Sequence, residues 1–113
     1  MKIILNNERP MSWNKIYAGQ HWSVRKEEAD RVHLMIKAAL GRLEYIINSP
    51  VKIVITAYFE NRPLDPDNIA SKFYIDGLKG LIKDDRWCDV LSVTTISRKD
   101  PNKPRVEIEI EED

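Results

Sequence analysis

The chain has 113 residues, of which 42% are hydrophobic and 32% are charged, and its 18 basic residues balance its 18 acidic residues. This composition is typical of a globular protein rather than a disordered one, and the length predicts one domain over residues 1–113. The zero net charge argues against a general nucleic-acid binder. No apolar run approaches the length of a bilayer span, and Met1–Leu5 is too short for a signal peptide, so we expect a cytoplasmic protein without a membrane partner.

The first half of the chain predicts a strand, a loop and a helix. Residues 2–5 form a short apolar run that ends in turn-forming residues. Residues 11–22 predict a long loop in which aromatic side chains alternate with polar and basic ones. Such a loop suits stacking on nucleic-acid bases, and it equally suits a loop folded onto its own sheet. From Ser23, a plausible N-cap, apolar residues recur every three or four positions as far as Ile47, which predicts a long helix.

The second half predicts another helix between strands. Strict alternation over residues 51–60 predicts a strand inside the sheet, and residues 68–79 predict an amphipathic helix that Gly80 ends. Residues 90–98 have the composition of a strand, and residues 105–111 alternate again. The outward glutamates of that last segment predict an exposed edge strand protected by charge. We therefore expect a single two-layer α/β (α+β) domain with a mixed sheet of about four strands and two main helices.

Two separated sets of acids bracket the second predicted helix. Asp65 and Asp67 precede it, and Asp84 and Asp85 follow it. Carboxylates are the ligands that Mg²⁺ and Mn²⁺ prefer, so these side chains could surround a hard cation in a site that acts on phosphate esters. The same residues also fit local punctuation, with Asp65 as an N-cap before Pro66 and the later acids as a solvated turn. Spacing alone does not decide between these interpretations.

Cysteine and histidine do not predict a site of their own. Cys88 is the only cysteine, so a disulfide within the chain is excluded and a reducing compartment fits. His21 and His33 lack the clustered spacing of zinc ligands. Zinc binding and Cys-His catalysis are therefore not expected.

Three motifs follow one another in order along most of the chain. They are Pro10-Met11-Ser12-Trp13-Asn14 with Tyr17; Asp65-Pro66-Asp67-Asn68 with Lys72 and Asp76-Gly77-Leu78; and Asp84-Asp85 before a strand. In this arrangement the chain resembles the RusA family of Holliday junction resolvases, small dimeric enzymes that cut four-way DNA junctions with magnesium. The first motif is similar to the family's proline-serine-asparagine loop.

The resemblance implies a RusA-like fold, a homodimer, and roles for individual residues. Asp65, Asp67 and Asp85 would bind Mg²⁺, for which Mn²⁺ could substitute, and Lys72 would be catalytic. The interval from Asp67 to Lys72 is one residue longer than the family's usual spacing, and one residue rotates a helical side chain by about 100°. We expect DNA contacts from Asn14, Lys15, Tyr17 and Arg62.

The function implied is that of a magnesium-dependent endodeoxyribonuclease. It would resolve four-way junctions by paired phosphodiester hydrolysis during DNA recombination and repair. The alternatives are a structure-selective nuclease for flaps or other branched DNA, a catalytically silent DNA-binding protein of the same fold, and a protein-interaction module whose acids are caps and turns. Catalysis requires Asp65, Asp67 and Asp85 to converge, whereas binding or scaffolding does not.

Overall fold

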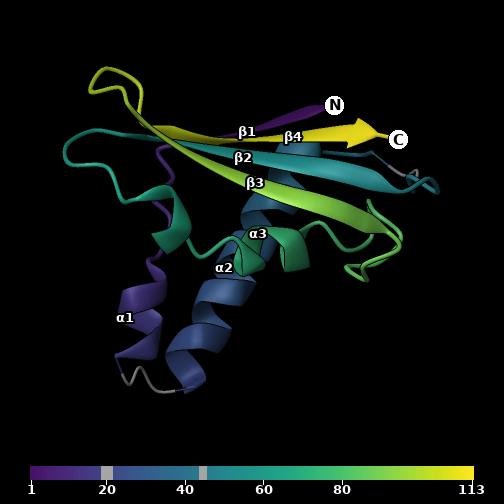
Figure 1. Ribbon diagram of the computed structural model, residues 1–113, viewed down its shortest axis with the longest axis horizontal. Helices are drawn as coiled ribbons and strands as arrows, with labels where there is room; N and C mark the ends of the chain where they lie inside the picture. The colour runs from purple at the N-terminus through teal and green to yellow at the C-terminus, as the bar shows by residue number, and fades with distance from the viewer. Residues whose placement is uncertain (19–21, 44–45) are drawn as a thin grey trace.

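A computed structural model describes residues 1–18, 22–43 and 46–113 of the chain. Its elements in order are β1 (Lys2–Asn6), α1 (Trp13–Tyr17), α2 (Trp22–Leu40), β2 (Val51–Phe59), the 3-10 helix η1 (Pro66–Asn68), α3 (Lys72–Gly77), β3 (Val90–Lys99) and β4 (Arg105–Glu112). The strands form one mixed sheet in the order β1-β4-β2-β3, and α2 and α3 lie together on one side of it (Figure 1). The predicted two-layer α+β fold is confirmed.

Strand β2 lies inside the sheet, as its alternating sequence predicted. It pairs with β4 in the antiparallel direction and with β3 in the parallel direction, and every second residue from Val51 to Phe59 is buried. The prediction of an edge strand over residues 105–111 is wrong, because β4 lies between β1 and β2. Its glutamates project instead from the uncovered face of the sheet. A central strand with one solvated face has the same alternation as an edge strand, so the pattern could not separate the two.

The core lies between the sheet and the helices. Helix α2 contributes Val32 and Ile36, and α3 and the residue after it contribute Tyr74 and Leu78, all of them almost completely buried. A Cβ atom at Gly77 would lie 2.7 Å from the Cδ1 atom of Ile36. This glycine therefore permits the close approach of α3 to α2.

The predicted first helix is shorter in the structure, and the loop before it contains a helix. Helix α2 begins at Trp22, so Ser23 lies inside it, and it ends at Leu40 before Gly41, whose φ of 64° suits a left-handed cap. Residues 44 and 45 of the predicted helix lie outside the described residues. In the predicted loop, the Ser12 side chain accepts a hydrogen bond from the Lys15 amide at 3.1 Å and starts α1.

The predicted helix over residues 68–79 is divided into η1 and α3. Between them the chain pairs with the N-terminal segment, because the Ala70 amide donates to the Met11 carbonyl at 2.9 Å and Ile69 forms an antiparallel bridge with Ser12. These long-range bonds replace the helical bonds that local periodicity predicted. Gly80, expected to end the helix, has a φ of 103° but lies beyond the last helical residue, Gly77.

A polar network is buried where β1 ends. The Glu8 carboxylate accepts two hydrogen bonds from Arg31 of α2, at 2.9 and 3.0 Å, and one from the Tyr74 hydroxyl of α3 at 2.8 Å. Glu28 also accepts hydrogen bonds from Arg31, and the bonds to Glu28 and Glu8 raise the pKa of the guanidinium. Burial, followed by the charge of Glu8, raises the pKa of Tyr74. The network connects the segment after β1 with α2 and α3.

None of the helices in the described ranges is long and apolar enough to span a bilayer.

Candidate functional site

The N-terminal segment and the first acidic motif meet in the structure, although they are far apart in the sequence. The pairing of Met11 and Ser12 with Ala70 and Ile69 brings α1 beside η1. The Asn14 amide then donates to the Asn68 Oδ1 atom at 3.0 Å. Two of the three motifs identified in the sequence are thus joined by hydrogen bonds.

A hollow of about 290 Å³ lies at this junction, and we call it the acid hollow. It is lined by Trp13, Asn14, Tyr17, Asp65, Asp67 and Asn68. The side chains of Asp65 and Asp67 have no hydrogen bond or ion pair with any described residue. Asp65 precedes η1 in an extended conformation, but its side chain does not cap that helix. The N-cap interpretation therefore does not account for Asp65, and both carboxylates are free to bind a cation.

Strand β3 holds the main chain on both sides of Asp65. The Thr95 hydroxyl donates to the Pro66 carbonyl at 2.7 Å, and the Ser97 hydroxyl donates to the Leu64 carbonyl. These side chains lie two positions apart and so belong to one face of the strand. The position of Asp65 is therefore fixed by the sheet rather than by η1 alone.

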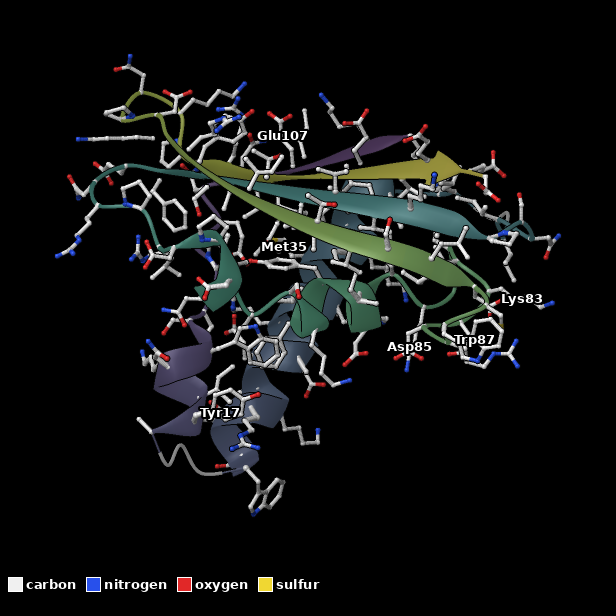
Figure 2. All side chains as sticks on the ribbon, in the orientation of Figure 1. Tyr17, Met35, Lys83, Asp85, Trp87 and Glu107 are labelled. Carbon is white, nitrogen blue, oxygen red and sulfur yellow. The ribbon has the colours of Figure 1, made fainter. Side chains whose placement is uncertain are left out.

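Asp85 does not line the acid hollow. Its Oδ2 atom lies 3.4 Å from the Lys79 Nζ atom, and Figure 2 places it near Trp87, away from Tyr17. A side-chain hydrogen bond shared with Asp84, together with the charge of Lys79, holds the pKa of Asp85 below its usual range. Within residues 1–18, 22–43 and 46–113, no three or more His, Cys, Asp or Glu side chains form a group that could hold a metal ion. The structure thus brings together two of the three predicted metal ligands.

Lys72 is the first residue of α3 and lies near the acid hollow without lining it. Its Nζ atom is 3.5 Å from an Asp76 carboxylate oxygen, and its side chain is 66% exposed. It lines a neighbouring cleft, to which Trp13 and Tyr17 also belong. Trp13 and Tyr17 therefore lie between Lys72 and the aspartates.

The four residues expected to contact DNA occupy different places. Asn14 and Tyr17 line the acid hollow. Lys15 opens onto a separate hollow of about 350 Å³ with Arg9 and Arg31, and Arg62 onto another of about 440 Å³ beside the end of β2. Only the first two are placed to act at the aspartates.

Sequence reasoning missed the residues that support the site. In the sequence, Thr95 and Ser97 are only part of the predicted strand over residues 90–98, and Asn68 is only the last residue of the first acidic motif. Their partners are 29, 33 and 54 positions away in the chain. The two-residue spacing of Thr95 and Ser97 was the one local signal, and it indicates a shared face but no partner.

Comparison of the sequence with protein-family models and with curated proteins gives no match. The donor set must therefore be judged by its own chemistry. Mg²⁺ is usually bound through one or two carboxylates together with substrate phosphates, rather than by a complete cage of protein ligands. Two unpaired carboxylates in a solvent-open hollow fit that requirement.

Proposed function

We propose that this protein is a magnesium-dependent endodeoxyribonuclease that resolves four-way DNA junctions by paired phosphodiester hydrolysis. The observation that carries the proposal is the pairing of residues 11–14 with residues 68–70, which surrounds two partnerless aspartates with aromatic and amide side chains. These are two of the motifs in which the chain resembles the RusA family. These two motifs would not be expected to line one hollow if the acids served only as helix caps and turn residues.

Asp65 and Asp67 are the residues that would hold Mg²⁺ or Mn²⁺. When bound, such an ion makes water nucleophilic at neutral pH and neutralises charge on the phosphate. Thr95 and Ser97 keep the Asp65 carboxylate directed into the hollow by fixing the carbonyls on either side of it. Asn68, held by the Asn14 amide, keeps η1 in place beside α1.

Lys72 and Asp85 would complete the site when substrate binds. The Lys72 ion pair with Asp76 is of the exposed kind, which contributes little stability, so a DNA phosphate can compete for the ammonium. The long flexible stem of Lys72 lets its charge follow the phosphate on which negative charge develops. Asp85 joins Asp65 and Asp67 as a third ligand only if its turn gives up the contact with Lys79.

A homodimer is part of the proposal. A four-way junction has two-fold symmetry, and a two-fold dimer presents two identical sites for paired nicks. We place the enzyme in the cytoplasm, acting on branched DNA in recombination and repair. Sedimentation at micromolar concentration should give a dimer, and a monomer there would contradict paired resolution.

The test is nicking of a labelled synthetic four-way junction, with a flap and a linear duplex as alternative substrates. In Mg²⁺ the protein should cut the junction symmetrically and leave the linear duplex intact. Asp67→Asn should lower the rate at least about 100-fold, because it removes a ligand of the ion that activates water. Asp113→Asn is the matched control, since this exposed aspartate lies outside the hollow and should have no effect.

Each other result supports a named alternative. Cutting of flaps in place of junctions would support the structure-selective nuclease. Junction binding without cutting would support the catalytically silent DNA-binding protein. The absence of both binding and cutting would support the interpretation of the aspartates as helix-cap and turn residues.

A further inference from the structure

A second hollow, which we call the basic cleft, adjoins the acid hollow. It has a volume of about 430 Å³, and its walls include Trp13, Tyr17, Arg25, Lys26, Lys72 and Phe73. Helices α1, α2 and α3 each contribute to it, and Figure 2 places Tyr17 where α1 and α2 face one another. Trp13 and Tyr17 line both hollows, so these two side chains form the wall between them.

The two hollows have opposite charge. Among the described residues, the acid hollow is lined by two aspartates and no cation, whereas the basic cleft is lined by three cations and no carboxylate. A strand of DNA carries a negative charge at every phosphate. The basic cleft suits such an anion directly, and the acid hollow suits it once a cation is bound there.

The cations of the basic cleft can exchange their present partners for a phosphate. Lys26 pairs with Asp30 at 3.1 Å in the exposed geometry that contributes little to stability. Arg25 donates one long hydrogen bond, at 3.5 Å, to the Ile16 carbonyl and keeps its other N–H donors. These cations therefore remain available to a ligand.

The aromatic wall offers a flat surface for a base. The rings of Trp13 and Tyr17 are stacked, with centroids 5.8 Å apart and an interplanar angle of 20°. Tyr17 is 75% exposed, although a tyrosine commonly buries its ring. A base can stack on such a ring only when it is not enclosed in a duplex.

We propose that the basic cleft binds an unpaired nucleotide of a DNA strand. The next phosphate along that strand then lies in the acid hollow. The base stacks on Tyr17, and the nucleotide's own phosphate lies beside Arg25 and Lys26, which leaves Lys72 for the phosphate in the acid hollow. This inference rests on the proposed nuclease function and adds to it the means of selection. Unpaired bases are exposed at branch points, so the enzyme recognises a branch by capturing one of them.

The test measures binding without catalysis. A fluorescein-labelled thymidine oligonucleotide of about ten residues, within the usual span of single-strand sites, is titrated in EDTA at low salt and followed by anisotropy. Tyr17→Ala should weaken binding roughly 5- to 100-fold through loss of stacking, and Tyr17→Phe should retain it. A duplex of equal length should bind Tyr17→Ala and the unmodified protein equally.

The salt dependence tests the cations separately. Arg25→Gln should reduce the slope of log K against log salt by about 0.7, the value expected for one phosphate contact on a single strand. Lys37→Gln, which removes the same charge from α2 outside the basic cleft, should leave the slope unchanged. Both side chains are exposed, as is Tyr17, so melting temperatures should stay at the wild-type value and show that the variants fold.

Three results would overturn the inference. They are no oligonucleotide binding by the unmodified protein, wild-type binding by Tyr17→Ala, and equal effects of Arg25→Gln and Lys37→Gln. If one of these appears while junctions are still cut, the nuclease proposal stands without the basic cleft. If the expected binding pattern appears but no DNA is cut, the basic cleft stands and the nuclease proposal fails.

Discussion

Two groups of carboxylates in this protein differ in what surrounds them. Glu8 is 4% exposed, and its oxygens accept hydrogen bonds from Arg31 and Tyr74. Asp65 and Asp67 face solvent and have no partner among the described residues. A buried carboxylate with complete hydrogen bonding can only hold the structure together, whereas a solvent-facing pair with none is available to a ligand. The presence or absence of hydrogen-bond partners therefore distinguishes the structural carboxylate, Glu8, from the candidate functional ones, Asp65 and Asp67.

The largest expected effect comes from a substitution that removes a partner of the buried Glu8 carboxylate. Arg31→Met leaves the Glu8 carboxylate buried with one neutral partner, and it should lower the free energy of unfolding by about 2–3 kcal/mol. This lies below the roughly 3–5 kcal/mol typical of a broken buried pair, because the Arg31 side chain is 42% exposed and water reaches part of the site. Chemical denaturation measures the change. Lys26→Met, which removes an exposed pair from the same helix, should change it by no more than about 1 kcal/mol.

The next effect is the stabilisation of the fold by Mg²⁺ bound to Asp65 and Asp67. Mg²⁺ at about 100 times its dissociation constant should raise the free energy of unfolding by about 2.7 kcal/mol, which thermal melting detects as a higher Tm. Asp67→Asn should abolish that rise and melt no lower than wild type in chelator, since it removes repulsion between neighbouring carboxylates. Identical melting of wild type in magnesium and in chelator would contradict the metal site.

A smaller effect tests how the sheet supports the functional pair. Thr95→Val removes the donor to the Pro66 carbonyl, and it should lower stability by about 1 kcal/mol and weaken Mg²⁺ binding about tenfold. Thr94→Val on the opposite face of the same strand is the control and should not change Mg²⁺ binding. Equal Mg²⁺ affinity in both variants would mean that Asp65 does not depend on β3.

The smallest effect uses a third group of carboxylates, on β4 and the turn before it. Hydrogen bonds from Arg105 lower the pKa values of Glu107 and Asp100 from their ordinary values of 4.5 and 3.8. A lowered carboxyl pKa stabilises the fold above the ordinary value, and this stabilisation is lost as pH falls through the lowered one. The Tm difference between wild type and Arg105→Gln should therefore be larger at pH 7 than at about pH 3. A difference that does not change with pH would assign the effect to the stacking of Arg105 on Tyr58.

The periodicity of apolar residues predicted the strands and helices whose form depends on neighbouring residues in the sequence. The alternation of residues 51–60 gave β2 and its inward face, because a strand buried on one side needs an apolar residue at every second position. The spacing of Val32 and Ile36 likewise indicated the buried side of α2. Neither signal contains the order of the strands, which is why β4 was assigned to an edge.

The candidate site was predicted only in part, because distant segments build it. The sequence identified Asp65, Asp67 and Tyr17, which line the acid hollow. It could not indicate that Ala70 would bond to Met11 and interrupt a helix, since that competition depends on a segment 59 positions away. The contact of Lys79 with Asp85 was also absent from any local pattern. The convergence of all three aspartates stays a prediction.

The pairing of β1 with β4 affects when the acid hollow can form during synthesis. Lys2 lies opposite Glu109 and Asn6 opposite Arg105, so the first strand finds its place only after the last has emerged from the ribosome (Figure 1). The segment that carries Trp13 and Tyr17 follows β1, so the pairing of β1 with β4 positions its start, and the pairing of Met11 and Ser12 with Ala70 and Ile69 positions it beside η1. A growing chain therefore contains both aspartates while the residues of β3 and β4 are still being added, and the walls around them are completed only after β4 has emerged.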